Sequence, residues 1–195
     1  MKIILSILIC LLLTFSVKAQ FSYNEDGQII PFSMTEKYKT LIDTSKINSC
    51  KLKSYNNDSL YNSLNKNNQG TFEFVGIPID TLINFKSVAT KYRIKEGTVW
   101  LYKIESKTAE QLYITIKQLE IPEGAYISLF PKEKELKIMG RQVFQKKDIN
   151  TTKFLEYIYG NQMVIEYFEP NKVDRKANII ISRIEYIFDS PLKKK

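Results

Sequence analysis

Short runs of apolar residues, each about as long as a β-strand and closed by turn residues, dominate the chain from Thr71 onward. In the run 98–105, Trp100, Tyr102 and Ile104 recur at every second position, the period of a strand with one buried face. The other runs that we expect to be strands are 111–119, 125–130, 136–144, 163–168 and 178–188. The pattern predicts an all-β fold, an antiparallel β-sandwich of the jelly-roll kind.

Turn residues separate these runs. Proline fixes φ and glycine frees the backbone in Ile121-Pro-Glu-Gly124, and Gly160-Asn161 precedes another run. Pro170 is expected to end the strand that begins at Met163. We therefore expect the last run, 178–188, to form a separate strand.

The first 19 residues have the layout of a secretory signal peptide. Lys2 supplies a positive start, residues 3–17 are almost unbroken apolar sequence, and Val17-Lys18-Ala19 offers a cleavage site. The apolar run is shorter than the ~20 residues that a membrane-spanning helix needs. We therefore expect a secreted protein, extracellular or periplasmic, that meets a membrane only during export.

Residues 20–69 are polar and irregular, with asparagine, serine and lysine concentrated in 55–58 and 62–69. Such a segment buries too little apolar area to offset the entropy lost on ordering. Phe32 and Tyr38 are isolated apolar residues within this polar segment. The expected organisation is a signal peptide (1–19), a poorly ordered leader or linker (20–69), a β-sandwich domain (70–190) and a basic tail (191–195).

The composition excludes several kinds of catalysis. The chain has no histidine, so Ser-His-Asp and Cys-His catalysis and histidine-based zinc sites are excluded. Once the signal peptide leaves, Cys50 is the one cysteine and has no partner for an internal disulfide. The seven glycines are too far apart for a phosphate-binding loop. We expect no enzyme activity, no cofactor and no metal.

Carboxylate pairs and aromatic residues are the side chains that could serve sugar chemistry. Glu166 and Glu169 should point to opposite faces of a strand, and Glu133 and Glu135 lie in a charged turn, so a glycosidase pair is not expected. Four aromatic residues offer either a sugar-binding platform or core packing, and core packing is favoured. They are Tyr92, Trp100, Tyr102 and Tyr113.

The charge pattern does not favour nucleic acid. The net charge is +8 at pH 7, but Lys193–Lys195 is the one dense basic cluster and the rest is mixed with acidic residues.

Three segments resemble the non-catalytic N-terminal domain of secreted bacterial lysyl endopeptidases and related trypsin-like serine proteases. They are Gly97–Ser106 (GTVWLYKIES), Leu119–Phe130 (LEIPEGAYISLF) and Gly160–Pro170 (GNQMVIEYFEP). The resemblance covers about residues 72–189 and implies a propeptide-like module that assists, inhibits or targets a protease. The family's catalytic residues would follow residue 189, so none is carried over. We therefore expect the chain to be either a truncated protease precursor or a domain that acts alone.

The alternation also predicts an outward row of apolar residues on the sandwich. Val99, Leu101 and Tyr113 alternate with residues expected to face inward, and an apolar outer row is typical of a covered face. The cover is either a trypsin-like protease or the leader, docked through Phe32 and Tyr38. The alternative function is a free-standing secreted module that binds carbohydrate or another surface polymer.

We predict that the signal peptide is cleaved between Ala19 and Gln20, because the apolar run ends there and alanine occupies the position before the cut. N-terminal sequencing of exported protein checks this, and an intact Met1 on membrane-bound material would contradict it.

Overall fold

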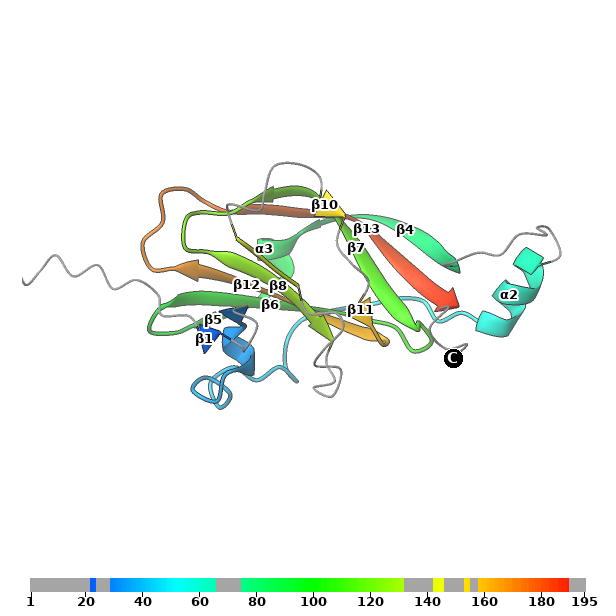
Figure 1. Ribbon diagram of the computed structural model, residues 1–195, viewed down its shortest axis with the longest axis horizontal. Coiled ribbons are helices and arrows are strands. Elements are labelled where there is room, and N and C mark those ends of the chain that lie inside the picture. Colours follow the sequence, from blue (N-terminus) through cyan, green and yellow to red (C-terminus); the bar gives the residue numbers. More distant parts are fainter. Residues whose placement is uncertain are drawn as a thin grey trace, which may run out of the picture.

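The computed structural model describes residues 22–23, 29–65, 75–131, 142–145, 153–154 and 158–189. Two β-sheets pack face to face, and their strands run antiparallel except where β3 pairs with β6 (Figure 1). The predicted all-β sandwich is therefore confirmed. The signal peptide 1–19 and the tail 191–195 lie outside the described residues.

The first sheet, here the β12 sheet, has the order β3-β6-β12-β8-β9, with β5 also pairing with β6. Its strands are β3 (Ser49–Lys51), β5 (Thr90–Arg93), β6 (Gly97–Glu105), β8 (Tyr126–Pro131), β9 (Gln142–Gln145) and β12 (Gln162–Pro170). The three segments of the family resemblance supply β6, the turn into β8 with most of β8 itself, and β12. These strands are neighbours in the sheet.

The second sheet, here the β13 sheet, has the order β10-β7-β13-β4, with β11 also pairing with β7. Its strands are β4 (Val75–Asn84), β7 (Gln111–Glu120), β10 (Lys153–Phe154), β11 (Ile158–Tyr159) and β13 (Asn178–Asp189). The remaining elements are the β1 (Ser22–Tyr23) and β2 (Ile29–Ile30) pair, the 3₁₀ turn η1 (Phe32–Met34), α2 (Asn57–Asn65) and α3 (Phe85–Val88).

The main core lies between the two sheets. Trp100, Tyr102 and Ile104 of β6 face it, as their alternation predicts, together with Leu112 and Ile114 of β7. Each fully buried side chain of this kind contributes about 1.5–3 kcal/mol relative to an exposed one. This core fixes which face of each strand points inward.

A second apolar layer covers the outer face of the β12 sheet. Residues 29–47, here called the N-terminal strap, lie against β6, β8 and β12 on the side away from the β13 sheet (Figure 1). The strap buries Ile29, Phe32, Tyr38, Ile42 and Ile47. They pack on Val99, Leu101, Tyr126, Phe130, Val164 and Phe168. The strap therefore differs from the irregular leader expected from composition, because its few apolar residues all find one surface.

Helix α2 also departs from the expected linker. The Asn56 side chain accepts a hydrogen bond from the Ser59 N–H at 3.0 Å, which caps the start of the helix. Asn57 accepts a bond from the Tyr186 hydroxyl at 2.6 Å and donates one to the Thr108 carbonyl at 2.7 Å. Asparagine thus supplies caps and anchors here, which its low apolar character does not reveal.

We predict that Gly97→Ala destabilises the domain by about 3 kcal/mol, because overpacking against rigid neighbours is costly. A Cβ at position 97 would lie 2.1 Å from the Glu169 carbonyl oxygen and 2.8 Å from Pro170 Cα, both backbone atoms. Urea unfolding measures the change. Thr98→Ala, next in the same strand, is the matched control and should cost less than about 1 kcal/mol. Equal losses for the two variants would contradict the argument.

Candidate functional site

The strap is fastened to the β12 sheet through the carboxylate of Glu166. This side chain is 0% exposed and lies in the middle of β12, on the outer face. Its two oxygens accept hydrogen bonds from the Phe32 N–H at 2.7 Å and the Ser33 N–H at 3.0 Å. The Tyr126 hydroxyl donates a third, short bond. One side chain thus holds two consecutive peptide groups of the strap.

The Phe32 ring completes this contact. Its centroid lies 4.7 Å from that of Phe168 and 5.5 Å from that of Tyr38. A buried carboxylate is costly unless its oxygens are paired, and here apolar rings exclude water while N–H and O–H groups supply the pairing. The arrangement is a latch that requires both the aromatic side chain and the adjacent backbone.

Burial raises the pKa of Glu166 above its ordinary value, while the hydrogen bonds from Ser33, Tyr126 and Phe32 act in the opposite direction. Burial also raises the pKa of Tyr126 well above its usual range, and the neighbouring Glu166 adds to that effect. The tyrosine therefore stays a hydrogen-bond donor at any physiological pH.

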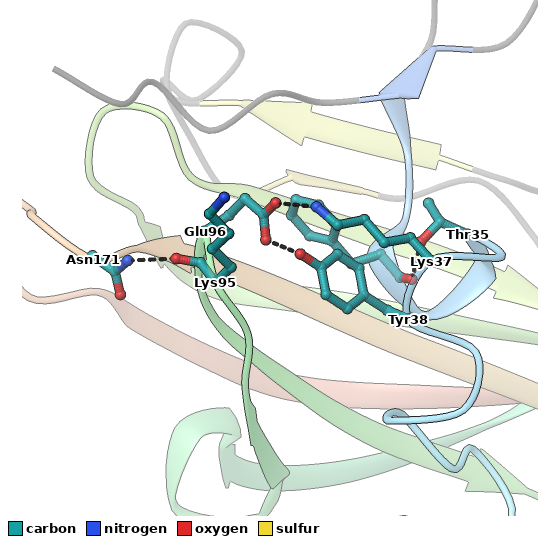
Figure 2. A network of polar contacts seen from close by, with 7 residues as sticks. Thr35, Lys37, Tyr38, Lys95, Glu96 and Asn171 are labelled. Atoms are coloured by element: carbon teal, nitrogen blue, oxygen red, sulfur yellow. Dashed lines mark hydrogen bonds and ion pairs between the residues drawn. The ribbon is translucent and has the colours of Figure 1, made fainter. Parts of the chain in front are cut away.

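A second anchor joins the strap to the turn between β5 and β6. The Lys37 ammonium lies 2.5 Å from one Glu96 oxygen, and the Tyr38 hydroxyl donates to the other oxygen (Figure 2). Partial burial tends to raise the pKa of Glu96, but the hydrogen bonds from Lys37 and Tyr38 outweigh it and hold that pKa below its ordinary value. Asn171 donates to the Lys95 carbonyl at 2.9 Å, which fixes the turn from the other side.

Hydrogen bonds also hold the end of the strap against the sheet. The Tyr92 hydroxyl donates to the Asp43 carbonyl at 3.0 Å, and the Asn48 side chain donates to the Val88 carbonyl at 2.8 Å. The chain then enters β3, which runs parallel to β6. The strap is consequently an integral layer of the fold.

The predicted interaction face must be corrected for this reason. Val99 and Leu101 do lie on the outer face of β6, but both are 0% exposed because the strap covers them. Tyr113 is also buried, and it belongs to the β13 sheet, so it does not continue their row. Of the two covers considered from sequence, the leader is the one present, and Phe32 and Tyr38 are among its contacts.

The aromatic residues considered as a sugar platform are mostly internal. Trp100 and Tyr102 lie in the main core, and the Trp100 ring lies 5.3 Å from that of Tyr167. Tyr92 is partly buried against the strap layer. Among aromatic side chains whose exposure the structure describes, Tyr61 on α2 is the most exposed, at 37%.

The carboxylates weighed for catalysis serve other purposes. Glu169 pairs with Lys86 at 2.9 Å and accepts from the Tyr167 hydroxyl at 2.7 Å, on the opposite face from Glu166 as expected. Glu166 is buried instead of solvated. Glu133 and Glu135 lie outside the described residues.

Cys50 lies in β3 and is partly buried, and burial raises the pKa of its thiol. Within the described ranges, no group of three or more potential ligands is placed to hold a metal ion. In the same ranges, no helix is long and apolar enough to cross a membrane.

The outer face of the β13 sheet, in contrast, carries exposed side chains. Leu82 of β4 is 76% exposed, the most exposed of the large apolar residues described. Arg183 of β13 is opposite Asp80, two residues before Leu82 on β4, and these two charged side chains pair at 2.8 Å. This face combines an apolar side chain with a surface ion pair.

No family model and no curated protein matches this sequence. Among solved structures, a family 6 carbohydrate-binding module aligns with 55% of this chain and 90% of its own, at 12% identity and a TM-score of 0.24. A superposition at this score does not establish a shared fold or a shared ligand.

We predict that Glu166→Gln destabilises the protein by about 2 kcal/mol at neutral pH, because the amide nitrogen cannot accept from a backbone N–H and leaves it unpaired. It should also alter the pH dependence. A carboxyl whose pKa is raised by folding stabilises the fold when protonated, and this contribution is lost as the pH rises from 4.5 through the raised pKa. The native protein should therefore lose stability above pH 4.5, and Glu166→Gln should lose less.

Urea unfolding across this pH range checks the prediction. The chain has no histidine, so no imidazole titrates in the window. The pKa values of Asp43, Glu96 and Glu105 are lowered, so their contributions are lost only as the pH falls. Identical pH profiles for the native protein and the variant would refute the assignment.

Proposed function

We propose that this chain is an exported, non-catalytic β-sandwich module that binds a trypsin-like serine protease of the lysyl endopeptidase kind. The observation that carries the proposal is the set of hydrogen bonds between Glu166 and the strap. The carboxylate that is most deeply buried in the described part is committed to the chain's own backbone, so it is not available for chemistry.

Other partly buried carboxylates are committed in the same way. Glu96 is held by Lys37 and Tyr38, and Glu105 accepts from Ser49 at 3.0 Å and pairs with Lys103 at 3.0 Å. Groups that could act as general acids or bases thus serve the fold, which supports a function exercised through the surface.

The family resemblance supports the choice of partner. Its segments form the adjacent strands β6, β12 and β8. Several of its residues have structural roles: Gly97 permits close approach to β12, Gly124 adopts a φ of 76°, and Glu166 fastens the strap. A chain with these residues therefore has the structural framework that the family resemblance implies for a protease-associated domain.

We place the protease contact on the outer face of the β13 sheet, because the strap already covers the outer face of the β12 sheet. An exposed leucine beside an ion pair has the mixed character of a protein interface. Leu82, Asp80 and Arg183 are the residues proposed to meet the partner.

We predict that the purified chain binds a lysine-specific, trypsin-like endopeptidase and that Leu82→Asp weakens this binding about tenfold, the effect of removing about 1.4 kcal/mol. Biolayer interferometry measures the affinity. Leu41→Asp, which changes a half-exposed leucine on the strap (51% exposed), is the matched control and should bind like the native chain.

The purified chain alone should not turn over a lysine ester. Retention on insoluble polysaccharide without protease binding would instead favour the alternative function, a carbohydrate- or surface-binding module. Equal weakening by both leucine variants would reject the proposed contact face.

A further inference from the structure

Exposed basic residues collect along one edge of the β12 sheet. Strands β3 and β5 both pair with the same side of β6 and form this edge. Five cationic side chains, here called the basic edge, are exposed on or beside these strands: Lys51, Lys53, Lys91, Arg93 and Lys95. The exposed charges on β3 and β5 are all positive.

The register of the strands gives the length of this edge. Arg93 is opposite Thr98, Lys91 is opposite Trp100, and Lys51 is opposite Glu105 on β6. The outer two positions are seven residues apart on β6, which at about 3.3 Å per residue is about 23 Å. The charges therefore follow the edge as a strip, with Lys91 and Arg93 on the face of Trp100 and Lys51 on the opposite face.

Nearby acidic groups do not neutralise the strip. Glu105 lies opposite Lys51 but forms its ion pair with Lys103, and Glu96 forms its ion pair with Lys37. In the described part of the chain, no carboxylate lies within 4.0 Å of the five basic groups. Lysines on an edge strand also prevent pairing between sheets, but that purpose does not require the acidic residues to be absent.

Aromatic rings position two of these cations. The Lys91 ammonium lies 5.4 Å from the Trp100 ring centroid, and the Lys53 ammonium lies 5.5 Å from that of Tyr55. Such contacts orient a flexible lysine without neutralising it. The charge stays available to a ligand.

We propose that the basic edge is a binding site for a linear anionic polysaccharide that carries carboxylates. An extended strip of unneutralised cations fits a flexible chain with regularly spaced negative charges, and an exported protein meets such polymers outside the cytoplasm. Lysine predominates over arginine, which suits spaced single charges better than paired phosphate oxygens. The site goes beyond the proposed protease contact and lies on the other sheet.

The test is titration of the full native chain with polygalacturonate by isothermal calorimetry, at about 50 and 200 mM salt. We expect binding that weakens at the higher salt concentration. Lys51→Glu, Lys91→Glu and Arg93→Glu combined should weaken it about tenfold to hundredfold, since each surface ion pair contributes up to about 1 kcal/mol.

The matched control combines Lys117→Glu, Arg175→Glu and Lys176→Glu, which changes the net charge equally at exposed positions away from the basic edge. This variant should keep most of the affinity. Thermal unfolding of both variants establishes that each is folded, and a misfolded triple variant is replaced by Lys91→Gln with Arg93→Gln. Protease binding should be unchanged in the edge variant, so failure here is distinguishable from failure of the proposed function.

Absence of binding to polygalacturonate at the lower salt concentration would overturn the proposal, as would equal losses in the two triple variants. Tighter binding of double-stranded DNA, weakened by the same edge variant, would also overturn it in favour of a nucleic-acid site.

Discussion

The bond between the Glu166 carboxylate and the Phe32 and Ser33 amides is the interaction on which the layered structure depends. It joins residues more than 130 positions apart and fixes where the strap begins on the sheet. With the carboxylate satisfied, the strap can cover the apolar side chains that surround it on the outer face of the β12 sheet. Without it, a buried charge would face the aromatic side chains of Phe32, Tyr126 and Phe168.

Because Glu166 holds the strap on the β12 sheet, some faces of the two sheets are buried and others are exposed. One face of the β12 sheet lies against the β13 sheet and the other lies under the strap, so both are core. Asp80, Leu82 and Arg183 of the β13 sheet and the edge formed by β3 and β5 remain exposed. The first offers an apolar side chain with an ion pair, and the second offers unneutralised positive charge. A single module of this kind has room for two partners of different chemistry.

Periodicity in the sequence predicts the strands and their inward faces, but it does not predict that the strap covers the outer face of the β12 sheet. Alternation at Trp100, Tyr102 and Ile104 correctly indicates the inward face of β6, since a strand repeats every two residues. The strap was missed because five apolar residues spread over 29–47 show no regular period. Its signal lay elsewhere: β12 has apolar residues on both faces around Glu166, which indicates a strand covered on both sides. The partner of the buried carboxylate could not be found, because backbone amides carry no sequence signature.

The position of β13 in the middle of its sheet constrains the order in which the protein can fold. β13 lies between β7 and β4, and its Asp189 is opposite Val75, more than 110 residues earlier in the chain. A chain that emerges N-terminus first from a ribosome exposes β4 and β7 long before the strand that joins them. High separation between paired residues slows folding. The β13 sheet therefore cannot close until β13 has emerged.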